Sequence, residues 1–157
     1  LIQLGSHIRI DDFCVISPGR DRFVFESYIH IGPFCSLIGA AAITMRDFSG
    51  LSARVTIYTS SDEYSGRSLT NPTVPDEYRN VASKPVELGR HVIVGTGAVI
   101  LPGASVGAGS AIAAMSLVNQ LIPEGVVAGG QPCRTIKPRN THHLELERDL
   151  KKKYGRE

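Results

Sequence analysis

The chain has 157 residues, of which 42% are hydrophobic and 6% aromatic, and its formal net charge is +2 at pH 7. This length predicts a single domain, and the nearly balanced charge gives no reason to expect a nucleic-acid partner. No apolar run approaches the roughly 18 residues that indicate a membrane span, so we expect a soluble protein. The many small aliphatic residues and few rings are typical of a narrow core.

Aliphatic residues recur every six positions along most of the chain. In chain order this ladder comprises Leu4, Ile10 and Ile16, then Phe25, Ile31, Leu37, Ile43 and Val55 with a break at Ser49, then Leu88, Val94, Ile100, Val106, Ile112 and Val118. Neither a helix, with its period of about 3.6, nor an alternating strand, with its period of 2, produces this spacing. A six-residue period predicts a short strand plus a corner, and three such sides close a triangular coil that stacks on the next.

A second series, mostly of small residues, follows the ladder four positions on. It comprises Ile29, Cys35, Ala41, Ala53 and Thr59 upstream, and Val92, Ala98, Ala104, Ser110 and Ser116 downstream. Gly89, Gly95 and Gly107 directly follow ladder residues, and we expect them to adopt backbone angles that a residue with Cβ resists. Because the step from 16 to 25 is not a multiple of six, residues 17–24 are expected to contain an insertion or bulge.

The three cysteines, Cys14, Cys35 and Cys133, have no CxxC or metal-ligand spacing and are odd in number. We interpret them as reduced packing residues, which favours a cytoplasmic location. The chain begins at Leu1 already in the register of the repeat, so a further N-terminal segment is expected to precede it in the whole protein.

Residues 60–85 break the repeat with a polar segment that contains Pro72, Pro75 and Pro85. A loop of this length in a compact domain is usually functional or disordered. Its mixture of tyrosine, acidic, arginine and asparagine side chains is typical of a hydrogen-bonding surface rather than a linker.

The repeat ends at residues 123–139, which lead into a charged helix expected near 142–153 with Leu144 and Leu150 among Glu and Lys residues. This helix is interpreted as a cap over the last coil. The expected organisation is therefore one repeat domain over 1–140, with the loop 60–85 extruded from it, and a C-terminal helical segment over 141–157.

Two motifs carry a family resemblance that covers nearly the whole chain. Residues 95–103, Gly-Thr-Gly-Ala-Val-Ile-Leu-Pro-Gly, resemble the coil "GAGAVILPG", and residues 127–137 are similar to the closing motif "AGNPxRxI" of the hexapeptide-repeat acyltransferases. The relevant branch contains galactoside and maltose O-acetyltransferases and sugar acetyltransferases of surface-polysaccharide clusters. The resemblance implies an all-β, left-handed parallel β-helix, a homotrimer, and acetyl-coenzyme A as co-substrate, without a metal, in the groove between subunits.

The resemblance also assigns coenzyme-binding residues. The positions that match the family's coenzyme groove are Gly97, Ala98, Ala114, Ser116 and Gly129, where backbone groups would line the extended pantetheine arm. Arg134 and Lys137 stand where the family places cations, and fixed positive charges suit the phosphates of the coenzyme.

One departure from the family concerns the general base. Galactoside and maltose acetyltransferases carry a histidine just after the strand that corresponds to residues 55–59, but here the chain reads Ser60-Ser61-Asp62-Glu63-Tyr64. Asp62 or Glu63 would serve as base for a hydroxyl only with a raised pKa. An amine is already a good nucleophile, so the missing histidine favours N-acetylation of an amino sugar. The alternative to a catalytic role is that Asp62 only caps a turn.

Other candidate residues follow from the same comparison. His30 is the substitute base if a trimer brings it to the groove, and the alternative is an exposed corner histidine without a catalytic role. The five histidines, His30 with His7, His91, His142 and His143, are too scattered to form a zinc site of the carbonic-anhydrase kind. In and beside the loop, the candidate acceptor-binding residues are Tyr58, Tyr64, Arg67 and Asn71.

The sequence therefore predicts an acetyl-coenzyme A-dependent acetyltransferase in the cytoplasm. Its expected acceptor is the amino group of a nucleotide-linked amino sugar used in surface-polysaccharide (O-antigen) biosynthesis. Two alternatives stay open, namely a sugar O-acetyltransferase and a catalytically silent, trimeric β-helix scaffold.

Overall fold

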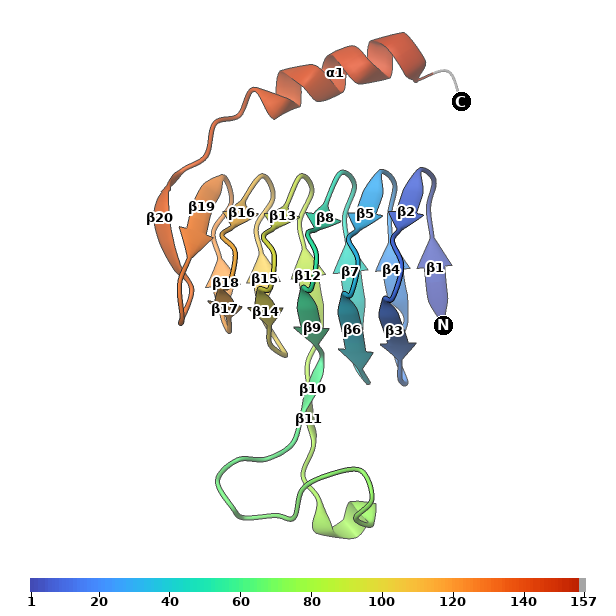
Figure 1. The fold of residues 1–157 in the computed structure, drawn as a ribbon, viewed down its shortest axis with the longest axis vertical. Helices are drawn as coiled ribbons and strands as arrows, with labels where there is room; N and C mark the ends of the chain where they lie inside the picture. Colours follow the sequence, from blue (N-terminus) through green and yellow to red (C-terminus); the bar gives the residue numbers. More distant parts are fainter. Residues whose placement is uncertain (156–157) are drawn as a thin grey trace.

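The computed structural model describes residues 1–155 and shows a three-sided β-solenoid of about six turns (Figure 1). The first face consists of β1 (Ile2–Leu4), β4 (Phe23–Phe25), β7 (Ile43–Met45), β12 (Val86–Leu88), β15 (Ser105–Val106) and β18 (Leu121–Ile122). The second face consists of β2 (Ile8–Ile10), β5 (Ile29–Ile31), β8 (Gly50–Leu51), β13 (Ile93–Val94), β16 (Ala111–Ile112), β19 (Val126–Gly129) and β20 (Arg134–Pro138). The third face consists of β3 (Val15–Pro18), β6 (Ser36–Gly39), β9 (Thr56–Tyr58), β14 (Val99–Ile100) and β17 (Leu117–Val118).

Neighbouring strands within each face are parallel, except that β20 turns back and pairs antiparallel with β19. The downstream ladder lines the interior as predicted, because Leu88, Val94, Ile100 and Val118 are completely buried and Val106 and Ile112 are nearly so. Each turn thus contributes one aliphatic side chain from each face, and the stacked turns bury a continuous narrow core. The prediction of a β-helix with an extruded loop and a short C-terminal helix is confirmed.

The upstream part of the predicted ladder was wrong in register. Met45 pairs with Phe25, Leu51 with Ile31 and Ile57 with Leu37, so these three residues continue the ladder. Ile43 and Val55 are buried in the second interior series, and Val55 takes the third-face position that was predicted for Ala53. Ser49 is the member of this series on the second face, opposite Ile29. The reason is the corner after β6, which is longer than a hexapeptide corner and shifts all later residues. The insertion expected within 17–24 is confirmed, since β3 ends at Pro18 and β4 begins at Phe23.

The glycines that follow ladder residues are required for space and not for unusual backbone angles, contrary to the prediction. Gly89, Gly95 and Gly107 are absent from the residues with positive φ. A Cβ on Gly95 would lie 2.5 Å from the backbone nitrogen of Ala114, and a Cβ on Gly107 would lie 2.5 Å from that of Glu124. These glycines therefore allow successive coils to approach to hydrogen-bonding distance.

Gly95→Ala is expected to lower the free energy of unfolding by about 3 kcal/mol, the upper end of the range for overpacking, because backbone atoms cannot move aside. Gly50→Ala is the matched control, because its Cβ would lie 3.5 Å from the nearest atom, an ordinary contact. Urea unfolding at equal protein concentration measures both changes. Equal effects of the two substitutions would contradict the spatial explanation.

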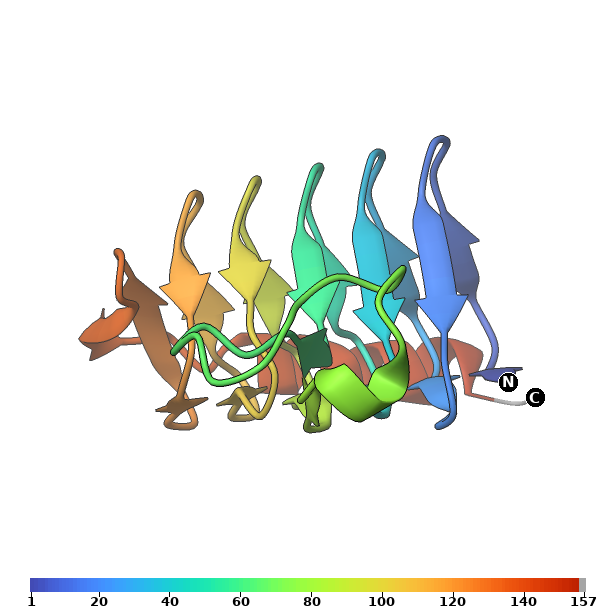
Figure 2. The same ribbon diagram turned by 90° about the horizontal axis from the view of Figure 1, so that it is seen from below.

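Two segments lie outside the solenoid, namely the loop between β9 and β12 and the C-terminal helix. Between β9 and β12 the chain leaves through the antiparallel pair β10 (Ser60–Ser61) and β11 (Ala82–Ser83) and forms a loop with the short helix η1 (Asp76–Tyr78). Helix α1 (His143–Tyr154) lies on the opposite side and runs back from the last coil toward the first (Figures 1 and 2). Of the segment 141–157 expected as helical, residues 156–157 lie outside the described residues. Within residues 1–155, no helix is long and apolar enough to cross a membrane.

Candidate active site

A cavity of about 250 Å³ lies where the extruded loop leaves the solenoid. The cavity lies directly after strand β9. There the antiparallel pairing of Ser60 with Ser83 and of Ser61 with Ala82 joins the two ends of the loop. The cavity is lined by Tyr58, Ser60, Ser61, Asp62, Tyr64, Leu101 and Pro102. The structure thus brings together three of the predicted site residues, Tyr58, Asp62 and Tyr64, in one pocket.

Asp62 is half-buried and lines this cavity together with a second one of about 410 Å³ inside the loop. Its Oδ2 accepts a hydrogen bond of 3.2 Å from the backbone N–H of Asn71, and its carbonyl oxygen accepts one from Ser61 Oγ. The hydrogen bond from Asn71 holds the carboxylate across the loop. A carboxylate placed in this way can accept a proton from a group bound in the cavity.

Glu63 does not have the raised pKa that a role as base was expected to require. Hydrogen bonds from the side chain and backbone of Ser65, with a further one from the backbone N–H of Arg67, hold the pKa of the Glu63 carboxyl below its ordinary value. A carboxyl group that is easier to ionise is a weaker base. Glu63 also does not line the cavity at the loop base, so the geometry favours Asp62 of the two adjacent acids.

Two of the other loop candidates, Arg67 and Asn71, do not line this cavity. Arg67 lines a separate hollow with Tyr78 and Arg79. The amide oxygen of Asn71 accepts hydrogen bonds from the N–H and the hydroxyl of Thr73, so this side chain shapes the loop. Tyr64 lines the cavity but is 92% exposed.

His30 lies on the exposed second face, apart from the loop. Its Nε2 lies 2.9 Å from Asp11 Oδ2, and Asp11 Oδ1 also accepts a hydrogen bond from Arg9. The hydrogen bond with His30 is the main cause of the lowered pKa of Asp11, followed by that with Arg9. A carboxylate that orients an imidazole is the arrangement a basic histidine uses.

Some of the predicted coenzyme-binding residues lie at the surface, whereas others are buried with their polar groups already hydrogen-bonded inside the solenoid. Gly97, with a φ of +70°, and the exposed Ala114 lie at successive corners between the second and third faces. Ala98 is buried, and its N–H and C=O are bonded to Gly95 and Thr56. The hydroxyl of Ser116 is likewise used inside the solenoid, where it donates to Ala113 and accepts from Gly130.

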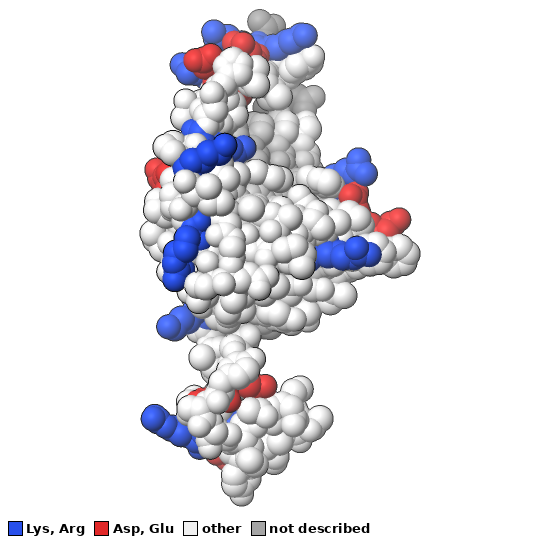
Figure 3. All heavy atoms as spheres, turned by 60° about the vertical axis from the view of Figure 1, so that its left-hand side comes forward, with Lys and Arg blue, Asp and Glu red and all other residues white. Residues whose placement is uncertain are grey.

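The last two strands bring the predicted cations to the surface. Gly129 is buried at the end of β19, where a Cβ would approach Ala113 to 2.8 Å, so the closing strand can pack tightly. Arg134 and Lys137 are exposed on β20, and Arg134 Nη1 donates to the carbonyl of Cys133. Figure 3 shows several Lys and Arg side chains spaced along this side of the molecule between α1 and the loop.

The cysteines are free thiols. Cys35 and Cys133 are buried and Cys14 is half-buried, and burial raises the pKa of Cys35 to about 11. They pack in the core, as predicted. Among the described residues 1–155, no three His, Cys, Asp or Glu side chains are grouped so that they could hold a metal ion.

Sequence reasoning missed part of the cavity wall. The sequence motifs do not predict that Ser60, Ser61, Leu101 and Pro102 line the cavity. Position 101 lies one turn of the solenoid after Tyr58, because β14 pairs with β9. The six-residue repeat could have predicted Leu101 and Pro102 as neighbours of Tyr58, because residues directly after paired strands lie at the same corner.

The acceptor and coenzyme candidates lie at different corners of one chain. The cavity with Asp62 lies after β9, between the third and first faces, whereas Gly97 and Ala114 lie between the second and third faces. This parallel β-solenoid with a pocket beneath an extruded loop matches the fold of the left-handed β-helix acyltransferases.

Comparison with known proteins places the chain within that class. No protein-family model matches it. It is 42% identical to the dTDP-4-amino-4,6-dideoxy-D-glucose acyltransferase of Escherichia coli over 146 residues, 93% of this chain and 76% of that protein. It is 32% identical to the galactoside O-acetyltransferase of Escherichia coli K12 over 127 residues, 75% of this chain and 58% of that protein. The chain therefore belongs to the hexapeptide-repeat acyltransferase family.

A solved structure agrees with this assignment. The crystal structure of AntD, an N-acyltransferase from Bacillus cereus in complex with dTDP and 3-hydroxybutyryl-CoA, matches with a TM-score of 0.93 and 37% identity. The match covers 98% of this chain and 81% of that one. A variant of the same protein was solved with dTDP-4-amino-4,6-dideoxyglucose and coenzyme A.

Proposed function

We propose that this protein is an acyl-coenzyme A-dependent N-acyltransferase that acetylates the amino group of a nucleotide-linked amino sugar. The observation that carries the proposal is the Asp62 carboxylate in the cavity at the base of the loop. The ligands of AntD and the name of the Escherichia coli relative support the choice of a dTDP-linked amino sugar.

The chemistry requires little from the protein beyond placement. The neutral amine attacks the thioester carbonyl, the carbon–sulfur bond breaks, and coenzyme A leaves as its thiolate. The amine loses one proton, which Asp62 accepts and can pass to the thiolate or to water. Holding the two reactants in line supplies much of the rate enhancement, and the carboxylate adds general-base assistance. Tyr58 and Tyr64 lie where they can contact the sugar.

Coenzyme A is proposed to lie along the corner that carries Gly97 and Ala114, with its phosphates near Arg134 and Lys137. Small residues leave room for the pantetheine arm, and exposed cations suit phosphate groups. Ala98 and Ser116 would then support this corner from inside, because their polar groups are already bonded.

A site that uses both corners needs two copies of the chain, and a homotrimer is proposed to supply them. An exposed apolar strip supports this assembly, because it runs beside the corner between the second and third faces. The strip comprises Phe13, Val15, Phe34, Ile93 and Met115, each at least 40% exposed. Exposed apolar surface of this extent indicates an interface.

Light scattering is expected to give the mass of a trimer at micromolar concentration. Phe13 and Phe34 stack with ring centroids 5.1 Å apart, so Phe34→Asp should weaken the assembly and the transfer activity together. A monomeric wild-type protein would contradict the intersubunit site.

Release of free thiol from acetyl-coenzyme A tests the function directly. We expect turnover with dTDP-linked 4-amino-4,6-dideoxyglucose and none with the matching 4-hydroxy sugar. Turnover with hydroxyl acceptors instead would favour the sugar O-acetyltransferase suggested by the galactoside relative. A silent scaffold would release no thiol, and its melting temperature would not rise with coenzyme A.

A role in surface-polysaccharide assembly is proposed on the basis of another relative. The chain is 26% identical to a putative lipopolysaccharide biosynthesis O-acetyl transferase of Escherichia coli K12, over 90% of this chain and 70% of that protein. Nucleotide-linked sugars and acetyl-coenzyme A are cytoplasmic metabolites, and the free thiols suit a reducing compartment. The proposed location is therefore the cytoplasm.

A further inference from the structure

Helix α1 has little apolar surface with which to hold itself on the solenoid. None of its residues is buried, and Leu144 and Leu146 are 43% and 56% exposed. By contrast, the side chain of Glu147 is only 10% exposed. Because isolated helices of this length are marginal in water, the contacts of Glu147 determine whether α1 stays folded on the solenoid.

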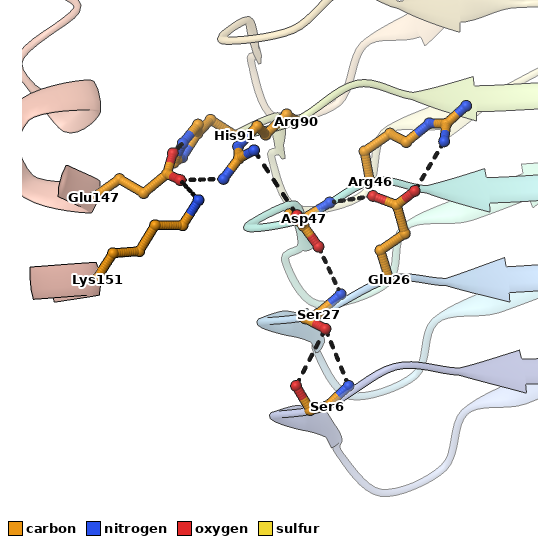
Figure 4. A network of polar contacts seen from close by, with 9 residues as sticks. All are labelled: Ser6, Glu26, Ser27, Arg46, Asp47, Arg90, His91, Glu147 and Lys151. Atoms are coloured by element: carbon orange, nitrogen blue, oxygen red, sulfur yellow. Dashed lines mark hydrogen bonds and ion pairs between the residues drawn. The ribbon is translucent and has the colours of Figure 1, made fainter. Parts of the chain in front are cut away.

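Glu147 accepts contacts from nitrogen atoms of the helix and of the corner beneath it (Figure 4). Arg90 donates to Oε1, His91 Nε2 lies 2.5 Å from Oε2, and Lys151 Nζ lies 2.6 Å from Oε1. Burial by itself would raise the pKa of Glu147. The hydrogen bonds from Lys151 and His91 and the charge of Arg90 outweigh burial, and lower this pKa from 4.5 to about 2.

Behind Arg90, polar contacts continue to the first coil. Arg90 Nη1 lies 3.9 Å from Asp47 Oδ2, and Asp47 Oδ1 accepts a hydrogen bond of 2.9 Å from the N–H of Ser27. The hydroxyl oxygen of Ser27 accepts a hydrogen bond from the N–H of Ser6. Figure 4 shows this series crossing the solenoid from coil to coil. The charge of Glu147 is thus connected to a fixed row of groups and not to one mobile side chain.

Stacked rings form the surface beside this row. His7, Tyr28, Phe48 and His91 stack at successive corners with centroids 4.5 to 5.0 Å apart. His143 from α1 packs on His91 at 4.8 Å with a tilt of 57°. Burial lowers the pKa of His143, and the nearby charges of His91 and Arg139 lower it further, so its neutral ring is the docked form.

The segment before α1 is anchored separately. Arg139 Nη1 donates to the carbonyl oxygens of His91, Gly109 and Ser110 at 2.9 to 3.1 Å, and its backbone N–H donates to Gly125. The helix can therefore leave the corner while residue 139 stays in place, with 140–142 as the hinge.

We propose that α1 is a charge-held clasp, docked on the corner between the first and second faces through Glu147 and released by high ionic strength or by acid. The ionisable groups that contact Glu147 are Lys151 on α1 and Arg90 and His91 on the corner. Around these lie His143 on α1, Arg139 before it and Asp47 behind Arg90. Without the negative charge of Glu147, the positive charges of Lys151, Arg139 and Arg90 outnumber that of the one remaining carboxylate, Asp47. Repulsion among these positive charges then disfavours docking of α1.

The pH dependence follows from the two lowered pKa values. Glu147 favours docking fully above its ordinary pKa of 4.5, and this contribution is lost as the pH falls toward 2. His143 favours docking while neutral, and its contribution is lost as the pH falls from its ordinary pKa of 6.5. Acidification therefore weakens docking at both residues.

Hydrogen exchange of the full-length protein tests the clasp. In Glu147→Gln, the amides of α1 are expected to exchange at least tenfold faster at pH 7 and low salt, and trypsin should cleave sooner after Arg148 and Lys151. About 1 M NaCl, where the Debye length is about 3 Å, should accelerate exchange in the wild type and leave the variant unchanged. The amides of β16 serve as the internal reference.

Glu145→Gln is the matched control, because Glu145 is exposed and contacts His142 on the same segment at 3.1 Å. It should leave exchange at the wild-type rate. Unchanged exchange in Glu147→Gln, an equal acceleration in Glu145→Gln, or a wild-type helix insensitive to salt would each overturn the proposal.

Discussion

Asp62→Asn is expected to lower turnover by about a hundredfold, because asparagine keeps the size and the hydrogen bond from Asn71 but cannot accept a proton. The Michaelis constants for both substrates should change little, since the substitution removes basicity and not shape. Steady-state thiol release across pH 6–9 measures both parameters. The loss should persist at every pH, because asparagine does not titrate.

His30→Gln is the comparison variant for this experiment. His30 is paired with Asp11 on the second face, so a hundredfold loss in His30→Gln with normal turnover in Asp62→Asn would move the base to the histidine. Near-normal turnover in both variants would mean that neither side chain is the base. The reaction would then depend on positioning a nucleophilic amine, which keeps the amino-sugar acceptor and removes the assigned base.

Arg134→Ala is expected to raise the Michaelis constant for acetyl-coenzyme A by about ten- to a hundredfold. A charge-assisted contact to phosphate contributes roughly 1.5–3 kcal/mol, which corresponds to that change in affinity. The melting temperature should stay near the wild-type value, because the Arg134 side chain is exposed and its hydrogen bond is to the neighbouring Cys133 carbonyl. Initial rates at varied coenzyme concentration and a thermal melt measure the two quantities.

The matched control for Arg134 is Arg20→Ala. Arg20 is also an exposed arginine, but it lies at the corner before β4, in the first turns of the solenoid. Its removal should leave the Michaelis constant unchanged. Equal constants for wild type and Arg134→Ala would show that Arg134 is an ordinary surface charge.

The sequence by itself determined the architecture, because a solenoid is a local, repeated structure. Each coil contacts only its neighbours, so a six-residue period is enough to predict the strands, the corners and the interior residues from Leu88 to Val118. The register error upstream has the same origin. One longer corner after β6 is invisible to a fixed period, and it moved Met45 into the place predicted for Ile43.

The chemical environment of the candidate residues was decided only by the tertiary structure. Asp62 and Glu63 are adjacent in sequence, yet one borders the cavity at the loop base while the other is held by the N–H groups of Ser65 and Arg67. Loop conformation depends on contacts between distant residues, and no periodic pattern encodes it. The six-residue period predicts that Ala98 and Ser116 are buried. It does not predict the hydrogen bonds that their polar groups form.

The docking of α1 shows the same division. Composition predicts a charged helix over about 142–153, and the structure forms it over His143–Tyr154. Its placement depends on Glu147 meeting Arg90 and His91, which lie more than fifty residues earlier in the chain. Repetition along the chain specifies the solenoid, whereas single long-range contacts between charged side chains specify where the helix rests on it.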